Sequence, residues 1–553
     1  MSFCFRRAVT WALLPCLCAV MAAPATRAQA PSPGLSTRAN TLPALGDAGD
    51  MTPLEERKLG DLIVRDLYRD TTYMDDPIIG EYVDGIWRQL LASAQVRGDL
   101  TPELAGRYAW HLVQVRDREI NAFALPGGYM GLNLGLIGVI DSRDELAAVL
   151  AHELSHTMQR HIARMIARQS REQPLLLAAL LTGILAAMRN PQVGAAVLTS
   201  GQATAVARQL SYSRDMEREA DRVGFGVFVQ AGFAQWGFAS MFEKLQTAAR
   251  INDNGDWPLL RSHPLTTERI ADAQERQRSL QGRPKPAPDW EALLIAARAR
   301  VLAQPGVDAL RGWARVPESA DFAKQPPEKR AAALYAAALS NAVLRDFPKA
   351  QNLAAQLAAL TADEARAMRQ VRLLQADLAL RAGQPARALQ LLPTGANTDA
   401  ARPAGASGLN GTGSADAGGR PDPARISFAG RATLLLRAEA QLQTGQAAQI
   451  KPVASSLQTW VSLHPEDALA WQRLAQAYQA QGLALRALRA EGEAQMANLD
   501  YAGAIDRWRA AQDYSRQHQS AAEDLIEASI VNVRLRAAQE ALKRQQEAEK
   551  KFQ

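Results

Sequence analysis

The chain has 553 residues, of which 47% are apolar and 22% charged, so it can form several domains with cores of ordinary globular composition. Length and composition together exclude a small disulfide-stapled scaffold, a wholly disordered chain and a polytopic membrane protein. The 63 Lys and Arg outnumber the 57 Asp and Glu by six, an excess too small by itself to indicate nucleic acid or a membrane as a partner.

The first 28 residues have the layout of a secretory signal peptide. Arg6 and Arg7 precede the apolar stretch 8–23, and small residues follow up to Ala30. We expect cleavage after Ala28, with cleavage after Ala30 as an alternative that Pro31 disfavours. The alternative is a retained membrane anchor, for which this apolar stretch is short. The segment therefore predicts export of the mature protein.

Cysteine usage restricts the chemistry that remains after export. All three cysteines lie inside the predicted signal peptide, at Cys4, Cys16 and Cys18. The mature protein is therefore expected to have no disulfide, and any metal site must use histidines and carboxylates. Residues 29–50, rich in Pro, Gly, Ala and Ser, are interpreted as a leader.

Helix and strand signals then alternate up to residue 133. The run Thr52-Pro53-Leu54-Glu55 supplies a capping box and a first-turn proline, and Asp76-Pro77 begins a second helix. Strand formers occupy 107–115, 120–125 and 129–133, and the last two segments flank the turn Pro126-Gly127-Gly128. This region is therefore expected to combine helices with a small sheet.

A helix beginning at the capping box Ser142–Glu145 carries the sequence His152-Glu153-Leu154-Ser155-His156. The four-residue spacing puts both imidazoles on one helical face, where His152 and His156 can share a zinc ion. Glu153 lies beside them and can act as general base toward the water that attacks the substrate. The alternative is a pair of surface histidines next to a helical glutamate.

A catalytic zinc needs a third protein ligand, and a second acidic helix offers one. Within Glu217-Arg218-Glu219-Ala220-Asp221, Glu217 can complete a site of two histidines and one glutamate. One turn later, Asp221 can accept the free N–H of a ligand histidine. Taken alone this acidic run is typical of a solvated helix face, but the histidine pair favours the metal interpretation.

These motifs together resemble a known family. The sequence 152–156 with 217–221, preceded by Asn121–Gly128 and followed by Ser262-His263-Pro264, is similar to the zinc metallopeptidases related to the prenyl-protein protease. With a signal peptide in front and helical repeats behind, the chain is most similar to the periplasmic members that enhance β-barrel assembly. The resemblance implies a helix-rich α+β, zincin-like domain with a small antiparallel sheet, followed by an all-α tetratricopeptide-type solenoid.

The resemblance also implies residue roles and partners. His152, His156 and Glu217 would hold one zinc ion in a gluzincin-type site, with Glu153 as the catalytic base. The peptidase would degrade misfolded or stalled outer-membrane proteins in the periplasm, and the repeats would contact the outer-membrane β-barrel assembly machinery. No nucleic-acid partner is implied.

The segment Tyr129, Met130, Gly131, Leu132 and Asn133 is a candidate substrate-binding strand, because an extended peptide can pair with an open sheet edge. The alternative is that this strand lies inside the sheet. The leucine-rich stretch 174–188 is short for a membrane span and is interpreted as a lid beside the cleft, with core packing or membrane-surface contact as alternatives. His161 is expected to be a solvated helix residue.

His263 is a candidate regulatory fourth ligand. Pro264 disfavours a helix at His263, which suits a loop side chain that can move onto and off the metal. The resemblance points the same way, since the matching loop approaches the zinc there. A loop histidine whose proline merely shapes a turn is the alternative.

Beyond about residue 290 the composition changes to Ala, Leu, Gln and Arg at helical period, so we place a metallopeptidase domain at 51–285 and a helical repeat domain at 290–553. Turns are expected at Asp346, Gly383, Gly445 and Gly482, spacings that favour tetratricopeptide repeats once a disordered insertion at 395–423 is set aside. An ordinary helical bundle is the alternative. The competing function for the whole chain is a non-catalytic chaperone or assembly scaffold with a structural or lapsed zinc site.

Overall fold

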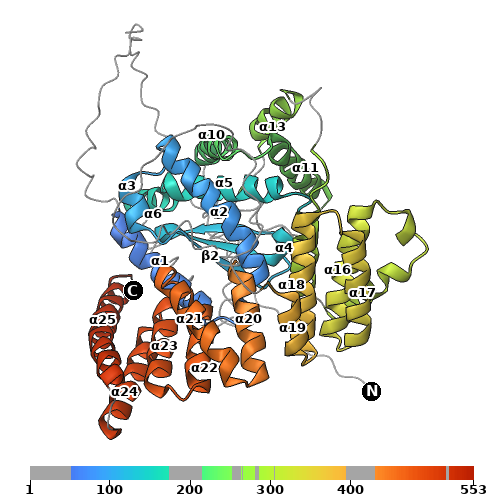
Figure 1. The fold of residues 1–553 in the computed structure, drawn as a ribbon. Helices are drawn as coiled ribbons and strands as arrows, with labels where there is room; N and C mark the ends of the chain where they lie inside the picture. Colours follow the sequence, from blue (N-terminus) through green and yellow to red (C-terminus); the bar gives the residue numbers. More distant parts are fainter. Residues whose placement is uncertain are drawn as a thin grey trace, which may run out of the picture. The chain divides into compact units, whose positions relative to one another are not determined.

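A computed structural model describes residues 51–172, 214–251, 263, 266–279, 286–303, 306–393, 430–518 and 522–552 of the chain (Figure 1). Four predicted features lie outside these residues: the signal peptide 1–28, the leader 29–50, the apolar stretch 174–188 and the insertion 395–423. All described elements belong to one unit, Gly49–Gln553.

The helix starts expected from capping residues occur in the structure. Thr52 forms the full capping box with Glu55 at the start of α1 (Pro53–Tyr68), and Asp76 accepts a hydrogen bond from the Ile79 N–H at the start of α2 (Pro77–Arg97). The box predicted before the zinc-motif helix forms only in part, because the Glu145 carboxylate accepts from the Asp141 N–H instead of from the capping serine.

A four-stranded sheet lies among the first helices, in the order β1-β2-β4-β3. The β3–β4 hairpin is antiparallel, whereas β2 and β4 are parallel neighbours, so the sheet is mixed where a wholly antiparallel one was expected. After β2 the chain first forms β3 at the end of the sheet. It then reverses through the hairpin and forms β4 between β3 and β2, running in the same direction as β2. The strands are β1 (Tyr73–Met74), β2 (His111–Val115), β3 (Ala122–Leu125) and β4 (Tyr129–Asn133).

The turn of the β3–β4 hairpin depends on two glycines. Gly127 and Gly128 have φ angles of 73° and 88°, in the left-handed region that other residues rarely adopt. A Cβ on Gly127 would also lie 2.5 Å from the Cα of Arg57, so the turn packs directly on α1. Further helices of this region are α3 (Pro102–Arg107), α4 (Leu134–Ile137), α5 (Arg143–Met158), α6 (His161–Glu172), α10 (Arg214–Gln230), α11 (Gln235–Ile251) and α13 (Thr267–Ser279).

The rest of the described chain is helical, which confirms the predicted fold class. Gly383, Gly445 and Gly482 all have positive φ angles between successive helices, and Asp346 caps the start of α17, as the turn spacing predicted. In Figure 1 these elements run from yellow-green to red. They are α14 (Trp290–Leu302), α15 (Val307–Arg315), α16 (Pro327–Val343), α17 (Phe347–Leu360), α18 (Ala365–Arg381), α19 (Pro385–Leu391), α20 (Arg431–Thr444), α21 (Ala447–Leu463), α22 (Ala468–Ala480), α23 (Ala484–Ala497), α24 (Tyr501–Gln517) and α25 (Ala522–Phe552).

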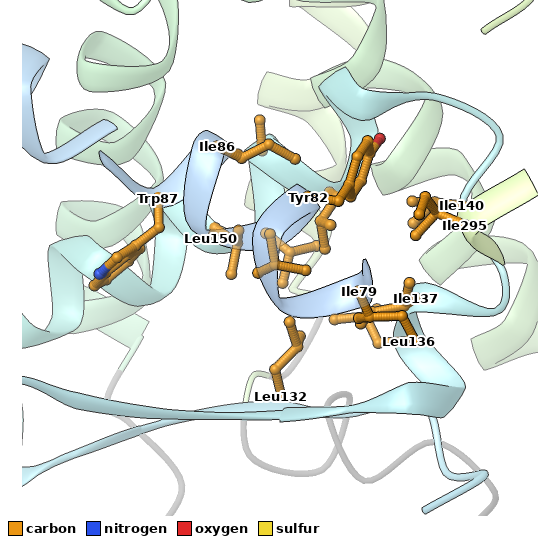
Figure 2. Packing of buried hydrophobic residues seen from close by; sticks show 14 of the residues in the cluster. Ile79, Tyr82, Ile86, Trp87, Leu132, Leu136, Ile137, Ile140, Leu150 and Ile295 are labelled. Carbon is orange, nitrogen blue, oxygen red and sulfur yellow. The ribbon is translucent and has the colours of Figure 1, made fainter. Parts of the chain in front are cut away.

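One apolar core joins the zinc-motif helix to several of these later helices. Ile86 of α2, Leu150 of α5 and Leu132 of β4 lie in the same buried cluster as Ile295 of α14 (Figure 2). The cluster also includes Leu380 of α18. Because these side chains exclude water together, α14 and α18 stabilise the part of the fold that carries the zinc motif.

None of the helices in the described ranges combines the length and the apolar content needed to cross a bilayer.

Candidate metal centre

The two histidines of the predicted zinc motif face the same point from α5. His152 and His156 are one turn apart, and both are buried. Their Nε2 atoms are 3.1 Å apart. The four-residue spacing therefore has the consequence expected from helix geometry, since both imidazoles converge on one location.

Glu217 reaches the same location from α10, which packs closely on α5. Gly224 permits this close approach, because a Cβ there would lie only 2.8 Å from the carbonyl oxygen of Ala151. The Glu217 carboxylate is 3.5 Å from the Nε2 atom of each histidine, through Oε2 for His152 and Oε1 for His156. The structure thus brings together the three side chains that the sequence selected as ligands.

These separations fit a zinc ion. Bonds of about 2.0–2.2 Å in a tetrahedral arrangement place zinc ligand atoms about 3.3–3.5 Å from one another. The two histidine Nε2 atoms are 3.1 Å apart, and each is 3.5 Å from one oxygen of Glu217, Oε2 for His152 and Oε1 for His156, so these separations are close to that value. Two imidazole nitrogens and one carboxylate oxygen are also a donor set that zinc prefers.

Asp221 and Arg269 orient the ligands from behind. Asp221 Oδ1 is 3.0 Å from His152 Nδ1 and accepts its N–H, which leaves His152 Nε2 free to face the metal position. Arg269 of α13 donates to Asp221 through Nε (2.6 Å) and pairs with Glu217 through Nη1 (2.6 Å). The contact between Asp221 and His152 agrees with the role predicted for Asp221. Nothing in the sequence pointed to Arg269, because an arginine in a highly charged helix is usually a surface residue.

The protonation preferences of the ligands reflect this crowding of charge. Burial alone would lower the pKa of His152, but its hydrogen bonds to Asp221 and Glu217 outweigh burial and raise the pKa to about 10. Burial lowers the pKa of His156, and the positive charge on its histidine neighbours lowers it further. Burial would raise the pKa of Glu217, yet its hydrogen bonds to His152 and His263 hold the pKa well below its usual range. Carboxylates that favour a protonated imidazole favour a metal cation at the same place.

Glu153 lies next to the ligands and is completely buried. Neither of its carboxylate oxygens accepts a hydrogen bond of normal geometry from the described residues. Burial raises the pKa of Glu153, while the charges of His263 and His152 and the backbone N–H of Ala124 lower it less strongly. A buried carboxylate with unused acceptor capacity beside a metal position is suited to bind a water molecule and accept its proton.

His263 joins the three predicted ligands. One donor atom of each of His152, His156, Glu217 and His263 lies within 4.8 Å of those of the others. His263 Nδ1 is 3.4 Å from His152 Nε2 and 2.8 Å from Glu217 Oε1. The side chain is buried and stands where a fourth ligand would stand.

The prediction that Tyr129–Asn133 offers an open sheet edge is wrong. This strand, β4, pairs with β2 on one side and with β3 on the other, and all five of its residues are buried. Among the described strands, β3 is the edge strand next to β4, and β1 is the edge strand at the other side of the sheet. Strand propensity alone could not reveal this order, because the order depends on where the chain re-enters the sheet after the hairpin.

An apolar pocket adjoins the candidate metal centre. Its volume is about 40 Å³, and its polar lining residues are His152, Glu153, Asp221, His263 and Arg269. If each water-sized group takes about 10–15 Å³, the pocket has room for roughly three such groups. That volume suits an aliphatic side chain of moderate size. Its apolar walls come from α5 and α11 and consist of Ala148, Val149, Phe238, Met241, Phe242 and Leu245.

Comparison with known proteins identifies similarity over the region that contains this centre. Residues 86–277 match the family model described as peptidase family M48. That range includes all four residues of the cluster and Glu153.

Three curated proteins extend the similarity. A Vibrio cholerae protein assigned as a β-barrel assembly-enhancing protease is 33% identical over 348 residues, which cover 62% of this chain and 67% of the relative. The β-barrel assembly-enhancing protease of Escherichia coli is 32% identical over 49% of this chain and 53% of its own length. The mitochondrial metalloendopeptidase OMA1 of Schizosaccharomyces pombe is 31% identical over 30% of this chain and 46% of its own length.

Proposed function

The chain belongs to peptidase family M48, with the β-barrel assembly-enhancing proteases among its relatives, and from this premise we propose that it is a zinc-dependent periplasmic endopeptidase. Its substrates would be misfolded or stalled outer-membrane proteins. The observation that carries the proposal is the convergence of His152, His156 and Glu217 beside the buried carboxylate of Glu153, whose nearest charged neighbour is His263 at 3.4 Å. The ligand set is of the gluzincin type, two histidines and a glutamate.

The residues of this chain divide the reaction among them. His152, His156 and Glu217 would hold zinc, which when bound lowers the pKa of a water molecule and polarises a peptide carbonyl. Glu153 accepts a proton from the attacking water at a carboxylate oxygen and then delivers it to the amide nitrogen that leaves. Asp221 keeps His152 in the tautomer whose Nε2 atom faces the site.

Substrate would bind in extended form along β3 (Ala122–Leu125). This strand forms one end of the described sheet and packs against α5, so a peptide that added to it would run past Glu153. Backbone pairing is independent of side chains, which suits a peptidase that meets many unfolded sequences. The adjoining pocket would favour an aliphatic residue next to the cleaved bond.

The helical part, 290–553, would serve as a tetratricopeptide-like surface for the outer-membrane assembly machinery, and the signal peptide 1–28 would deliver the chain to the periplasm. The helices α16 to α24 connect at turns whose spacing suits such an array. Tests of partner binding should keep the full chain, because Ile295 and Leu380 share the core of the proposed catalytic domain 51–285.

A non-catalytic chaperone or scaffold is the second candidate function. A purely structural zinc site needs no general base, so the buried Glu153 favours the peptidase. Incubating the zinc-loaded chain with one outer-membrane barrel protein, unfolded and folded, separates the two. The peptidase should cleave the unfolded form and spare the folded one. A scaffold would bind the unfolded form and leave it intact.

We further propose that His263 restrains the peptidase by occupying the fourth metal position. A catalytic zinc keeps that position open for water, so a histidine there must leave before reaction. If His263 binds the metal in about nine molecules of ten, only about one in ten is active. His263→Ala should then raise the basal rate of casein cleavage about tenfold. The measurement is initial rate at equal zinc content.

The control for this prediction is His464→Ala at the end of α21, which should keep the wild-type rate. An unchanged or slower rate for His263→Ala with full zinc content would show that His263 is not an inhibitory ligand.

A further inference from the structure

The His161 imidazole lies against the His156 ring, so the expectation that His161 is solvated is wrong. His161 is completely buried, and its ring centroid is 4.8 Å from that of His156. The two Nδ1 atoms are 2.8 Å apart, a hydrogen-bond distance. One partner in that contact is a proposed zinc ligand.

A break in the helix produces this contact. On an unbroken helix, five residues advance by about 500°, which would turn His161 about 140° away from His156. Instead α5 ends at Met158, and Arg160 adopts a left-handed conformation with φ of 54° before α6 begins at His161. Arg160 donates from Nε to Glu56 Oε1 (2.6 Å), which ties the reversal to α1.

The hydrogen bonds define a direction of proton donation. When His156 Nε2, which faces His152 and Glu217, binds the metal, the N–H of His156 is carried on Nδ1 and is donated to His161 Nδ1. His161 must then carry its own hydrogen on Nε2, which is 3.0 Å from Glu219 Oε2. Arg164 Nη1 also donates to that oxygen, at 2.9 Å, and keeps Glu219 in place as an anion.

From this chain of contacts we propose that His161 is a positioning residue for zinc binding, acting through His156 and supported by Glu219. The inference rests on the proposed metal centre. In this arrangement the hydrogen bond from His156 to His161 orients His156, as the hydrogen bond from His152 to Asp221 orients His152. An imidazole in the middle fixes both the tautomer and the ring plane of His156, because it accepts on one nitrogen and donates on the other.

The test measures zinc affinity, not activity, in the full chain by competition with a chromogenic chelator at fixed pH. His161→Phe keeps the ring but removes the acceptor, and should weaken zinc binding about 10–100-fold, the usual effect of losing such a support. His161→Asn retains an acceptor oxygen and should recover part of that loss. In cobalt-substituted protein, the visible absorption bands should shift in His161→Phe and return toward wild type in His161→Asn.

Two further variants keep the test decisive. Glu219→Gln changes a side chain that is 28% exposed and should weaken zinc binding to a smaller extent. His111→Phe, on β2, replaces a half-buried histidine whose ring neighbours are Tyr68 and Tyr129, and should leave affinity unchanged. Zinc affinities within twofold of wild type in both His161→Phe and Glu219→Gln would overturn the positioning role. A wild-type chain that binds no zinc would instead overturn the proposed function.

Discussion

Replacing Glu153 with Gln is expected to lower the rate of casein cleavage by roughly 10²–10⁴-fold, the usual contribution of a general base. The amide has the shape of the carboxylate but cannot accept the proton of the attacking water. Zinc content should remain that of the wild type, because the three proposed ligands are His152, His156 and Glu217. The measurements are casein cleavage and metal analysis on the same sample.

Glu103→Gln is the matched control, since it makes the same chemical change on an exposed side chain of α3. It should cleave casein at the wild-type rate. Full activity in Glu153→Gln would exclude Glu153 as the base, and loss of zinc from that variant would mean that the carboxylate is needed to bind the metal.

The second large effect is expected at Arg298, which joins α14 to α2 and α18. Its guanidinium is 2% exposed and donates to Asp76 (2.8 Å) and Asp377 (3.0 Å). Arg298→Leu would leave two carboxylates buried without this partner, which typically costs about 3–5 kcal/mol. The midpoint of thermal unfolding of zinc-free protein should therefore fall by several degrees.

The loss at Arg298 should also depend on pH. Burial would raise the pKa of Asp377, but the charges of Arg298 and Arg381 hold it below its usual value. In the wild type this carboxylate therefore contributes stability that is present above the unfolded-state pKa of about 3.9 and disappears as the pH falls through the lower folded-state pKa. Without Arg298, burial should raise the folded-state pKa of Asp377 above that of the unfolded state. The stability of the variant should then increase as the pH falls from about 7 toward about 4 and Asp377 becomes protonated.

The difference in unfolding midpoint between wild type and Arg298→Leu should consequently narrow from pH 7 toward pH 4. Arg311→Leu supplies the control, because Arg311 is exposed and its change should alter stability by less than about 0.5 kcal/mol. A difference that stayed constant or widened in acid would contradict the proposed role of the buried ion pairs.

Local sequence rules were sufficient for the parts of the site that depend on one helix. The spacing of His152 and His156 predicts a shared face whatever else the chain does, and capping residues placed the starts of α1 and α2. Glu217 could be selected because a zinc site of two histidines needs a third ligand. These inferences require only helical periodicity and metal chemistry.

The remaining features depend on contacts between distant segments. The interior position of β4 follows from strand order. The pairing of Arg269 with Glu217 and Asp221 follows from where α13, which packs on α11, places the arginine. His161 meets His156 only because Arg160 leaves the helical conformation. A short stretch of sequence could not predict these contacts, because each depends on tertiary packing that overrides local preference.

Zinc reconstitution of chelator-treated protein tests the catalytic metal centre most directly. Zinc content and casein cleavage are measured together as zinc is added back to wild type and to Glu217→Gln. We predict that wild type binds about one zinc per chain and regains cleavage in proportion to zinc bound, while Glu217→Gln binds zinc weakly and stays inactive. Cleavage by the metal-free wild type, or full zinc binding and activity in Glu217→Gln, would contradict the proposed metal centre.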